Sequence, residues 1–308
     1  MHEFQPLSDI FIDLGFFQWQ KYSLMILLGL AIAILLGIKE GKKLGISGET
    51  IIDGAIVIVP LSIAGTRLWY VAFEWSRFYV PGSVGDTLMK IINISEGGLA
   101  IHGGFLTALV SVIIYTHYKK INVFKVFDLM APGFLIAQAF GRWGNFFNQE
   151  AHGGVIGGAG NLSLDEQRAF LSDTLHLPDY ITNNMYLYGP DGLRYYHPTF
   201  LYESIWNVIG FIIILILRRT KLTRTGDMIG FYLIWYSVGR FFIEAMRTDS
   251  LYIGDTGLRT AQIISLIMIA AGVVFLVINR TIFKQPKYYE ALAEIEEQNS
   301  NTIEENVL

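Results

Sequence analysis

The chain contains no cysteine and few charged residues. Asp, Glu, Lys and Arg make up 16% of its 308 residues, against about 25% in an ordinary soluble domain. The missing cysteine excludes a disulfide framework, a thiolate metal site and a thiol nucleophile supplied by the chain itself. So little charge, with a formal net charge of −4, also excludes a disordered chain, a coiled coil and a basic surface for nucleic acid.

Apolar residues make up 52% of the chain and gather in long runs. Seven of these runs approach the ~20 residues that a helix needs to cross ~30 Å of hydrocarbon. They cover residues 22–38, 50–73, 98–118, 123–140, 198–217, 227–246 and 260–279. The sequence therefore predicts an all-α integral membrane protein with seven transmembrane helices.

The distribution of Lys and Arg predicts how these spans are oriented. Basic residues crowd the short loops after the first, third and fifth spans and the segment after the seventh, as in Lys42, Lys119, Arg218 and Arg280. Cytoplasmic loops carry such an excess. We therefore expect the N-terminus outside and the C-terminus in the cytoplasm.

Three parts of the chain follow from this topology. Residues 1–21 are predicted to be an extracytoplasmic interfacial segment, and residues 22–280 a seven-span membrane domain. Residues 141–197 of that domain contain a large extracytoplasmic loop. Residues 281–308 are predicted to be an acidic cytoplasmic tail.

Polar residues inside the spans gather at one depth, near the outer side. Asp53 and Asp128 lie near the cytoplasmic starts of their spans, where an acid favours a helix N-terminus. Five spans instead contribute to an outer level, whose members are Arg67, His102, Arg142, Asn145, His197, Tyr202, Glu203, Arg240 and Glu244. Because charges are costly in the membrane unless paired or hydrated, this level is a predicted functional site.

At the outer level the arginines outnumber the glutamates. Arg240 and Glu244 are spaced i, i+4 and can pair on one helix face. The remaining guanidinium groups suit phosphate oxygens, and a phospholipid headgroup lies at this depth. The alternative is an ion-pair network that only orders the bundle.

Two glycine-rich stretches carry the densest motifs. EGGLAIHGG (96–104) places glycines around His102, a side chain whose unperturbed pKa lies near neutrality. In GRWGNFFNQEAHG (141–153), Arg142, Asn145 and Gln149 are spaced to line one helix face, while the aromatic residues suit a belt at the membrane interface. The histidines and Glu150 show no metal-binding spacing, so no metal site is predicted.

Three classes of function remain open on these grounds. One is an enzyme that acts on a lipid at the outer level. Another is a polytopic transporter or channel with an outer-leaflet anion- or lipid-binding site, which needs polar residues through the full depth of the membrane. The third is a structural or receptor membrane protein.

Four stretches of the chain resemble the bacterial prolipoprotein diacylglyceryl transferase family. They are EGGLAIHGG, GRWGNFFNQEAHG, HPTFLYES (197–204) and GRFFIEAMR (239–247), and they occur in the order that this family shows. GTRL (65–68) and DLMAP (128–132) are also similar to the family. The chain departs from it at Gln20-Lys21-Tyr22-Ser23, where the family has Trp-Tyr-Gly, and after Arg247, where Thr248-Asp249-Ser250 replaces Pro-Asp.

The resemblance implies an activity and its partners. Such enzymes transfer the diacylglyceryl group of phosphatidylglycerol to the lipobox cysteine of a prolipoprotein, forming a thioether and releasing glycerol phosphate. No cofactor is implied. The expected partners are phosphatidylglycerol, lipobox-containing prolipoproteins and membrane lipids, and no nucleic acid.

The resemblance also implies roles for individual residues. His102, Arg142, Arg240 and Glu244 are the expected catalytic residues. His102 is the first choice as base and Glu244 or Glu203 the second, while the arginines stabilise the leaving phosphate. The expected substrate-binding residues are Tyr22, Arg67, Asn145, Asn148, Glu150, Gly153, His197, Tyr202, Glu203 and Arg247.

Overall fold

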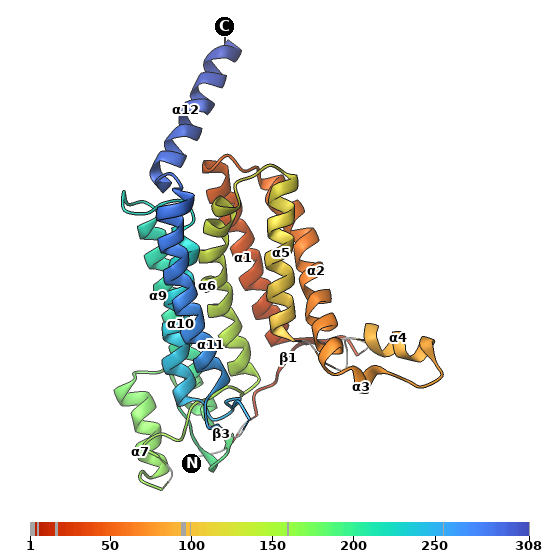
Figure 1. The fold of residues 1–308 in the computed structure, drawn as a ribbon. Coiled ribbons are helices and arrows are strands. Elements are labelled where there is room, and N and C mark those ends of the chain that lie inside the picture. Colours follow the sequence, from red (N-terminus) through yellow and green to blue (C-terminus); the bar gives the residue numbers. More distant parts are fainter. Residues whose placement is uncertain are drawn as a thin grey trace. The chain divides into compact units, whose positions relative to one another are not determined.

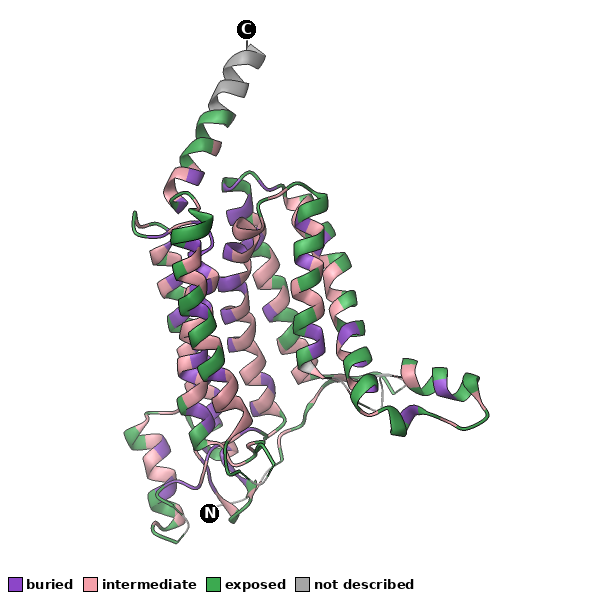
Figure 2. Ribbon diagram, viewed as in Figure 1, coloured by how far each residue is buried: buried purple, intermediate pink, exposed green. Residues whose placement is uncertain are grey.

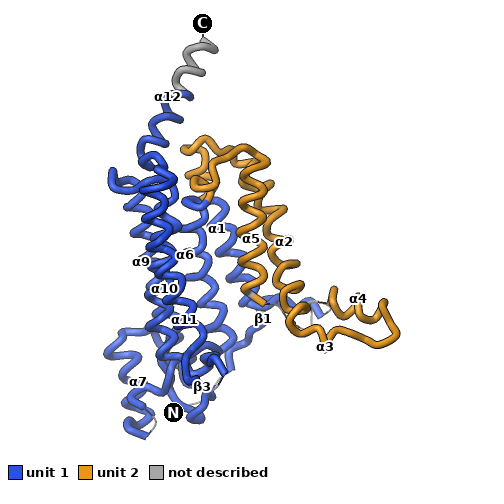
Figure 3. Tube along the Cα trace, in the orientation of Figure 1, with its two compact units in different colours: residues 1–36, 127–308 blue, residues 37–126 orange. Residues whose placement is uncertain are grey.

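The computed structural model describes residues 4, 6–15, 18–93, 97–98, 100–158, 160–254 and 256–307, without the side chains of Ile101 and 299–307. The fold is mostly helical. It divides into two compact units, of which the first comprises residues 1–36 and 127–308 and the second residues 37–126 (Figure 3). Glu96 and Leu99 of the EGGLAIHGG motif lie outside the described residues.

Helices form most of the first unit (Figure 1). The long ones are α1 (Lys21–Lys43), which continues into the second unit, α6 (Val123–Phe147), which starts there, and α9 (Thr199–Leu217), α10 (Asp227–Met246) and α11 (Thr260–Ile278). A π-helical turn η2 (Asn279–Phe283) leads to α12 (Tyr288–Val307). The shorter elements are β1 (Ile10–Asp13), β2 (Gln18–Gln20), α7 (Leu164–Ala169), η1 (Phe170–Thr174), α8 (Asp179–Asn184), β3 (Tyr186–Gly189) and β4 (Gly192–Tyr195).

The second unit is built on α2 (Gly48–Phe73) and α5 (Ile101–Tyr118), with α3 (Trp75–Phe78) and α4 (Val84–Ile92) between them in the chain. Glycines bring α2 and α5 close together. A Cβ on Gly103 would lie 2.5 Å from the carbonyl oxygen of Gly65, and one on Gly104 would lie 2.4 Å from Thr66. These glycines of the EGGLAIHGG motif therefore allow the close packing of α2 and α5.

Five helical segments among the described residues are long and apolar enough to cross a membrane: Lys21–Lys43, Gly48–Phe73, Val123–Phe147, Thr199–Leu217 and Thr260–Phe283. They match five of the predicted spans. The other two predicted spans correspond to α5, which has 18 residues, and to α10, which carries Asp227, Arg240 and Glu244. Large apolar side chains are exposed on the bundle, such as Ile56, Phe242 and Ile267. Such a surface suits lipid, and the chain is a multi-pass membrane protein.

Small residues let α1 and α6 approach within the first unit. A Cβ on Gly29 of α1 would lie 2.9 Å from the Cα of Ala137, and one on Gly133 of α6 would lie 3.1 Å from the Cβ of Ala33. Small residues at such contacts allow close backbone packing between membrane helices. α6 also extends seven residues beyond its predicted end, to Phe147, so that GRWGNFF, the first half of the GRWGNFFNQEAHG stretch, is helical.

Two tryptophans join α9 to α10. The indole N–H of Trp206 donates to the carbonyl of Trp235, and that of Trp235 donates to the carbonyl of Trp206. The two rings stack with centroids 4.3 Å apart. Gly210 and Gly239 accommodate them, because a Cβ at either glycine would lie 2.3 Å from an indole atom. Buried residues concentrate on α6, α9 and α10, whereas α11 is mostly half-buried or exposed (Figure 2).

The start of α10 is held by buried acids. Asp128 of α6 accepts hydrogen bonds from the backbone N–H groups of Gly226 and Met228, at 2.6 and 3.0 Å. The expectation that Asp128 favours the N-terminus of its own helix is therefore wrong, because it caps α10. Asp227 in turn accepts from Asn279 at 2.9 Å and pairs with Arg280 at 3.1 Å, which ties the end of α11 to the same place.

The large loop between α6 and α9 is a folded region, which we call the head (residues 148–198). It contains α7, η1 and α8 and the antiparallel hairpin of β3 and β4, so the all-α prediction omits its strands. In the hairpin turn, Gly192 has a φ of +83°, a conformation that glycine adopts without strain. The core of the head includes Leu171 and Tyr196, with Phe146 of α6 and Phe200 of α9 buried among them.

The aromatic residues of the GRWGNFF stretch anchor this core. Phe146 is 3% exposed, and Trp143 and Phe147 pack against the same cluster. The rings of Phe146 and Phe200 lie 4.6 Å apart. The predicted aromatic belt at the membrane interface is therefore wrong for Phe146, whose ring is covered by protein. The N-terminal segment forms a second small hairpin, in which β1 pairs with β2.

A glycine substitution tests the tryptophan contact. In Gly239→Ala the new methyl group meets the ring of Trp206, which its stacking and hydrogen bonds hold in place, so we expect a loss of about 1–3 kcal/mol of stability. Thermal unfolding in detergent measures the change. The control is Gly85→Ala in α4, where nothing lies within 4 Å and the helix gains about 0.5–1 kcal/mol from losing a glycine. Equal melting temperatures for the two variants would contradict this packing.

Candidate functional site

Glu203 joins three helices by ion pairs. One of its carboxylate oxygens lies 2.7 Å from Nη2 of Arg142 on α6, and the other lies 3.2 Å from Nη1 of Arg240 on α10. Glu203 itself is in the first turns of α9. Each carboxylate oxygen therefore faces one guanidinium group, and the two arginines are held on either side of a single acid.

Arg240 also pairs with Glu244 on its own helix. The two side chains are spaced i, i+4 and meet at 2.5 Å, which confirms the pairing predicted from the spacing. We call Arg142, Glu203, Arg240 and Glu244 the arginine cluster. It holds two positive and two negative side chains, so the predicted surplus of arginine is absent from this cluster of the first unit. The surplus was counted with Arg67, which belongs to the second unit.

Exposure distinguishes the two kinds of side chain in the cluster. The side chains of Arg142 and Arg240 are 19% and 17% exposed, whereas those of Glu203 and Glu244 are 3% exposed. The carboxylates therefore lie behind the guanidinium groups and orient them. The accessible edges belong to the arginines, and N–H groups at such edges can bind a phosphate.

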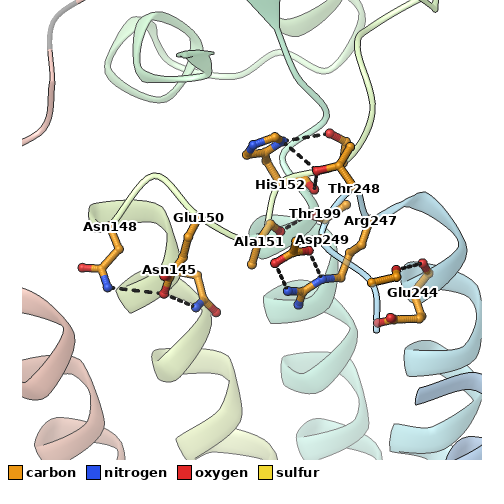
Figure 4. Close-up of polar contacts among 12 residues, drawn as sticks. Asn145, Asn148, Glu150, Ala151, His152, Thr199, Glu244, Arg247, Thr248 and Asp249 are labelled. Atoms are coloured by element: carbon orange, nitrogen blue, oxygen red, sulfur yellow. Dashed lines mark hydrogen bonds and ion pairs between the residues drawn. The ribbon is translucent and has the colours of Figure 1, made fainter. Parts of the chain in front are cut away.

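A chain of hydrogen bonds runs from Arg142 to the start of the head. Nη1 of Arg142 donates to the side-chain oxygen of Asn145 at 3.2 Å, and the amide of Asn145 donates to Glu150 at 2.8 Å. Asn148 donates to the same oxygen of Glu150 at 3.3 Å (Figure 4). The structure thus brings together four residues of the GRWGNFFNQE motif that the sequence singled out.

Gln149 does not share the helical face of Arg142 and Asn145. It lies beyond the end of α6 with a φ of +50°. Its side chain accepts a hydrogen bond from the backbone of Leu7 at 3.3 Å. The prediction of a common face for these three residues is wrong, because α6 ends two residues before Gln149.

Gly153 lies where three backbone segments meet. Its N–H donates to the carbonyl of His197 at 2.9 Å, and it forms an isolated bridge with Arg247. A Cβ at Gly153 would lie 2.8 Å from that of His197 and 3.0 Å from Thr199. The absence of a side chain therefore lets the head pack directly against the start of α9 and the end of α10.

Arg247 and its neighbours form the end of α10. Arg247 binds Asp249 through two parallel hydrogen bonds of 2.9 and 2.7 Å (Figure 4). Thr248 contacts the side chain and the carbonyl of His152. Burial raises the pKa of Asp249, but the hydrogen bonds and charge of Arg247 outweigh it and hold that pKa below its usual value.

His197, Tyr202 and Tyr22 lie around these groups within the first unit. Nδ1 of His197 is 3.2 Å from the hydroxyl of Tyr202, and burial lowers the pKa of His197. His197 therefore stays neutral near pH 7. Tyr22 packs on Gly144, where a Cβ would lie 2.6 Å from the ring of Tyr22.

Sequence reasoning missed two residues at this site. Tyr236 lies within hydrogen-bonding reach of Arg142, and its place one turn before Arg240 is a spacing that could have indicated it. Arg259, just before α11, donates to the carbonyl oxygens of Glu244 and Arg247. No sequence pattern marks Arg259, because its partners are backbone atoms.

Arg67 and His102 belong to the second unit. All five N–H groups of Arg67 donate to backbone carbonyls, which are those of Lys90, Ile91, Asn93, Gly97 and Gly98. Its guanidinium also lies 4.8 Å from the ring of Phe78. Arg67 thus holds the end of α4 and the chain that follows, and substrate binding by it stays a prediction. His102 is exposed in the first turn of α5.

Apolar helices, with a half-buried arginine cluster beside a folded head, define a multi-pass membrane protein. The model of the family "prolipoprotein diacylglyceryl transferase" matches residues 9–278. Relatives named phosphatidylglycerol–prolipoprotein diacylglyceryl transferase include proteins of Listeria innocua, 45% identical over 92% of this chain and 94% of the relative, and Bacillus cytotoxicus, 44% identical over 92% and 96%. The chain belongs to the prolipoprotein diacylglyceryl transferase family.

The ion pair of Asp249 predicts a pH-dependent stability. Because the folded state lowers the pKa of Asp249, the pair stabilises the fold above the unfolded pKa of about 3.9 and this contribution is lost as the pH falls through the folded pKa. We expect wild type to melt above Asp249→Asn at about pH 6 and the gap to shrink towards about pH 3.

The matched control for this experiment is Asp179→Asn. Asp179 also pairs with an arginine, Arg168, but its side chain is 79% exposed, so solvent screens the pair and the control should stay close to wild type. A gap between wild type and Asp249→Asn that is constant with pH would contradict the assignment.

Proposed function

We propose that the chain transfers the diacylglyceryl group of phosphatidylglycerol to the lipobox cysteine of prolipoproteins. Its family and the names of its relatives support this activity. The observation that carries the proposal in the structure is the arginine cluster, in which Glu203 holds Arg142 and Arg240 side by side with their guanidinium edges accessible. Two guanidinium groups suit a phosphodiester whose phosphate gains negative charge as it becomes the leaving group.

The reaction replaces one bond to the carbon of the diacylglyceryl group that carries the phosphate. The cysteine sulfur of the prolipoprotein forms a thioether bond to that carbon, and the bond from the carbon to the phosphate oxygen breaks. The electron pair leaves with the oxygen, so that glycerol phosphate is released. The thiol proton passes to a base, because the thiolate is the stronger nucleophile.

The proposed roles follow from these bonds. Arg142 and Arg240 bind the phosphate and stabilise its second charge, and Glu203 and Glu244 orient them. His102 is the proposed base, since the carboxylates of both glutamates already form ion pairs with guanidinium groups. The other proposed substrate-binding residues are Tyr22, Arg67, Asn145, Asn148, Glu150, Gly153, His197, Tyr202 and Arg247.

The proposal includes a topology and a location. We propose seven spans in a bacterial cytoplasmic membrane. They are the five long apolar segments together with α5 and α10. The N-terminus lies outside and the C-terminus inside, as the Lys and Arg distribution favours. Residues 1–21 form the extracytoplasmic segment, residues 22–280 the catalytic domain and residues 281–308 the cytoplasmic tail. The head is then extracytoplasmic.

A transfer assay tests the function directly. Purified protein in vesicles is incubated with labelled phosphatidylglycerol and a lipobox peptide. We expect release of labelled glycerol phosphate together with a gain of one diacylglyceryl mass on the peptide cysteine. A peptide whose cysteine is replaced by serine is the control. If neither product forms with the cysteine peptide, the proposal is wrong.

Variants of the site test the roles. Arg142→Gln and Arg240→Gln remove charge from the leaving phosphate, so we expect transfer to fall by about 100-fold or more. His102→Gln removes the proposed base, with an expected loss of about 100-fold or more. Steady-state transfer rates are compared with the amount of protein inserted in the membrane.

The control for these variants is Arg280→Gln. Arg280 also forms an ion pair, with Asp227, but at the opposite end of α10, so its transfer rate should stay at the wild-type level. A site variant that inserts normally and transfers like Arg280→Gln loses its proposed role. Equal loss of insertion and transfer would count against a catalytic role as well.

A further inference from the structure

Three polar side chains lie one helical turn from the arginine cluster, on the side away from the head. Gln138 precedes Arg142 by four residues on α6, Asn207 follows Glu203 by four on α9, and Ser237 precedes Arg240 by three on α10. Residues three or four apart lie on the same helix face. Because ion pairs hold the three charged residues together, these polar residues share a second level, about 5.4 Å further along the bundle.

Four of the polar atoms of these three side chains have no hydrogen-bond partner among the described residues. Both amide atoms of Asn207, the hydroxyl of Ser237 and the side-chain oxygen of Gln138 are buried without a hydrogen bond. Asn207 and Ser237 are 0% exposed. The side-chain nitrogen of Gln138 is engaged, because it donates to the hydroxyl of Tyr232 at 2.9 Å.

The helices at this level are held tightly. Ser204 of α9 donates to the carbonyl of Ala139 on α6, and the stacked pair of Trp206 and Trp235 joins α9 to α10. Gln138 is held by its bond to Tyr232. Neither the backbones nor Gln138 can readily shift to satisfy the unpaired atoms.

Leaving these atoms without partners would be costly. A buried amide or hydroxyl without a hydrogen bond lowers the stability of a protein, and no solvent reaches a lipid-embedded bundle from the side. Apolar residues at these three positions would avoid the cost. The presence of three polar residues at these positions therefore points to a hydrogen-bonding partner that does not belong to the chain.

The chemistry of the unpaired atoms indicates what this partner is. They comprise acceptors on Gln138 and Asn207, a donor on Asn207 and a hydroxyl on Ser237 that can do either. None carries a charge, so the site suits a neutral group that donates and accepts. We propose that Gln138, Asn207 and Ser237 form a binding site for hydroxyl groups, which we call the hydroxyl site.

Two sources can supply such hydroxyl groups. One is ordered water, which typically makes about three hydrogen bonds when buried. The other, which rests on the proposed function, is the headgroup glycerol of phosphatidylglycerol, whose two hydroxyls follow the phosphate along a three-carbon chain. With the phosphate at the arginine cluster, such a chain reaches about one helical turn. The hydroxyl site would then select the glycerol headgroup.

A lipid that lacks these hydroxyls distinguishes the two sources. Phosphatidylpropanol has the same charge and the same number of headgroup carbons as phosphatidylglycerol. If the headgroup occupies the site, wild type transfers from phosphatidylglycerol roughly 10- to 100-fold faster, since the propanol leaves buried polar atoms unpaired. Asn207→Leu then brings this ratio close to one, and Ser237→Ala lowers it in the same direction.

The matched control is Ser265→Ala in α11. Ser265 is also buried in a spanning helix, but its hydroxyl donates to the carbonyl of Ala261, so the ratio should stay at the wild-type value. The ratio is insensitive to how much protein folds, because both lipids are compared on one preparation. A merely structural role for Asn207 would lower both rates together and leave the ratio unchanged.

Water is the source if wild type and Asn207→Leu use both lipids equally. An experimental structure without phosphatidylglycerol should then show water oxygens within hydrogen-bonding distance of Asn207 and Ser237. Equal use of both lipids together with a dry site overturns the proposal. If wild type transfers from neither lipid, the proposed function fails, while the search for bound water still tests the hydroxyl site.

Discussion

The carboxylate of Glu203 is the interaction on which the first unit depends. Each of its oxygens holds one guanidinium, so a single side chain of α9 sets the positions of α6 and α10. Without this acid, two positive groups would face each other in an interior that solvates charge poorly. The contact that assembles the three helices is therefore also the one that holds the two guanidinium groups on either side of one carboxylate, and a change at Glu203 alters helix packing and the arginine cluster together.

The scarcity of hydrogen-bonding partners inside a membrane explains how the polar groups are arranged. They lie in two layers along α6, α9 and α10. The ion pairs of the arginine cluster lie beside the head, and the uncharged hydroxyl site lies one helical turn further from the head. The head adds a core of its own, into which Phe146 inserts from the end of α6. The last turns of α6 are therefore held by apolar packing on one side and by charge on the other, which places Asn145 and Glu150 beside Arg142.

Sequence reasoning predicted those features that depend on local spacing. Five apolar runs form long helices, and the i, i+4 spacing predicted the pair of Arg240 and Glu244. It failed where backbone atoms are the partners. The carbonyls bound by Arg67, the amides capped by Asp128 and the carbonyls held by Arg259 belong to segments distant in the chain. The folded head was also read as a loop, because its elements are short and their core draws on residues of α6 and α9.

The helix that carries Arg240 is held at both termini by side chains from other helices. Asp128 binds the first amides of α10, and Arg259 binds its last carbonyls. Axial sliding of α10 would break one contact or the other. These contacts therefore hold Arg240 at a fixed position along the axis of α10. Any movement that admits a substrate must then come from rotation about side-chain bonds and from the segments of the head, and not from a piston-like movement of the helix.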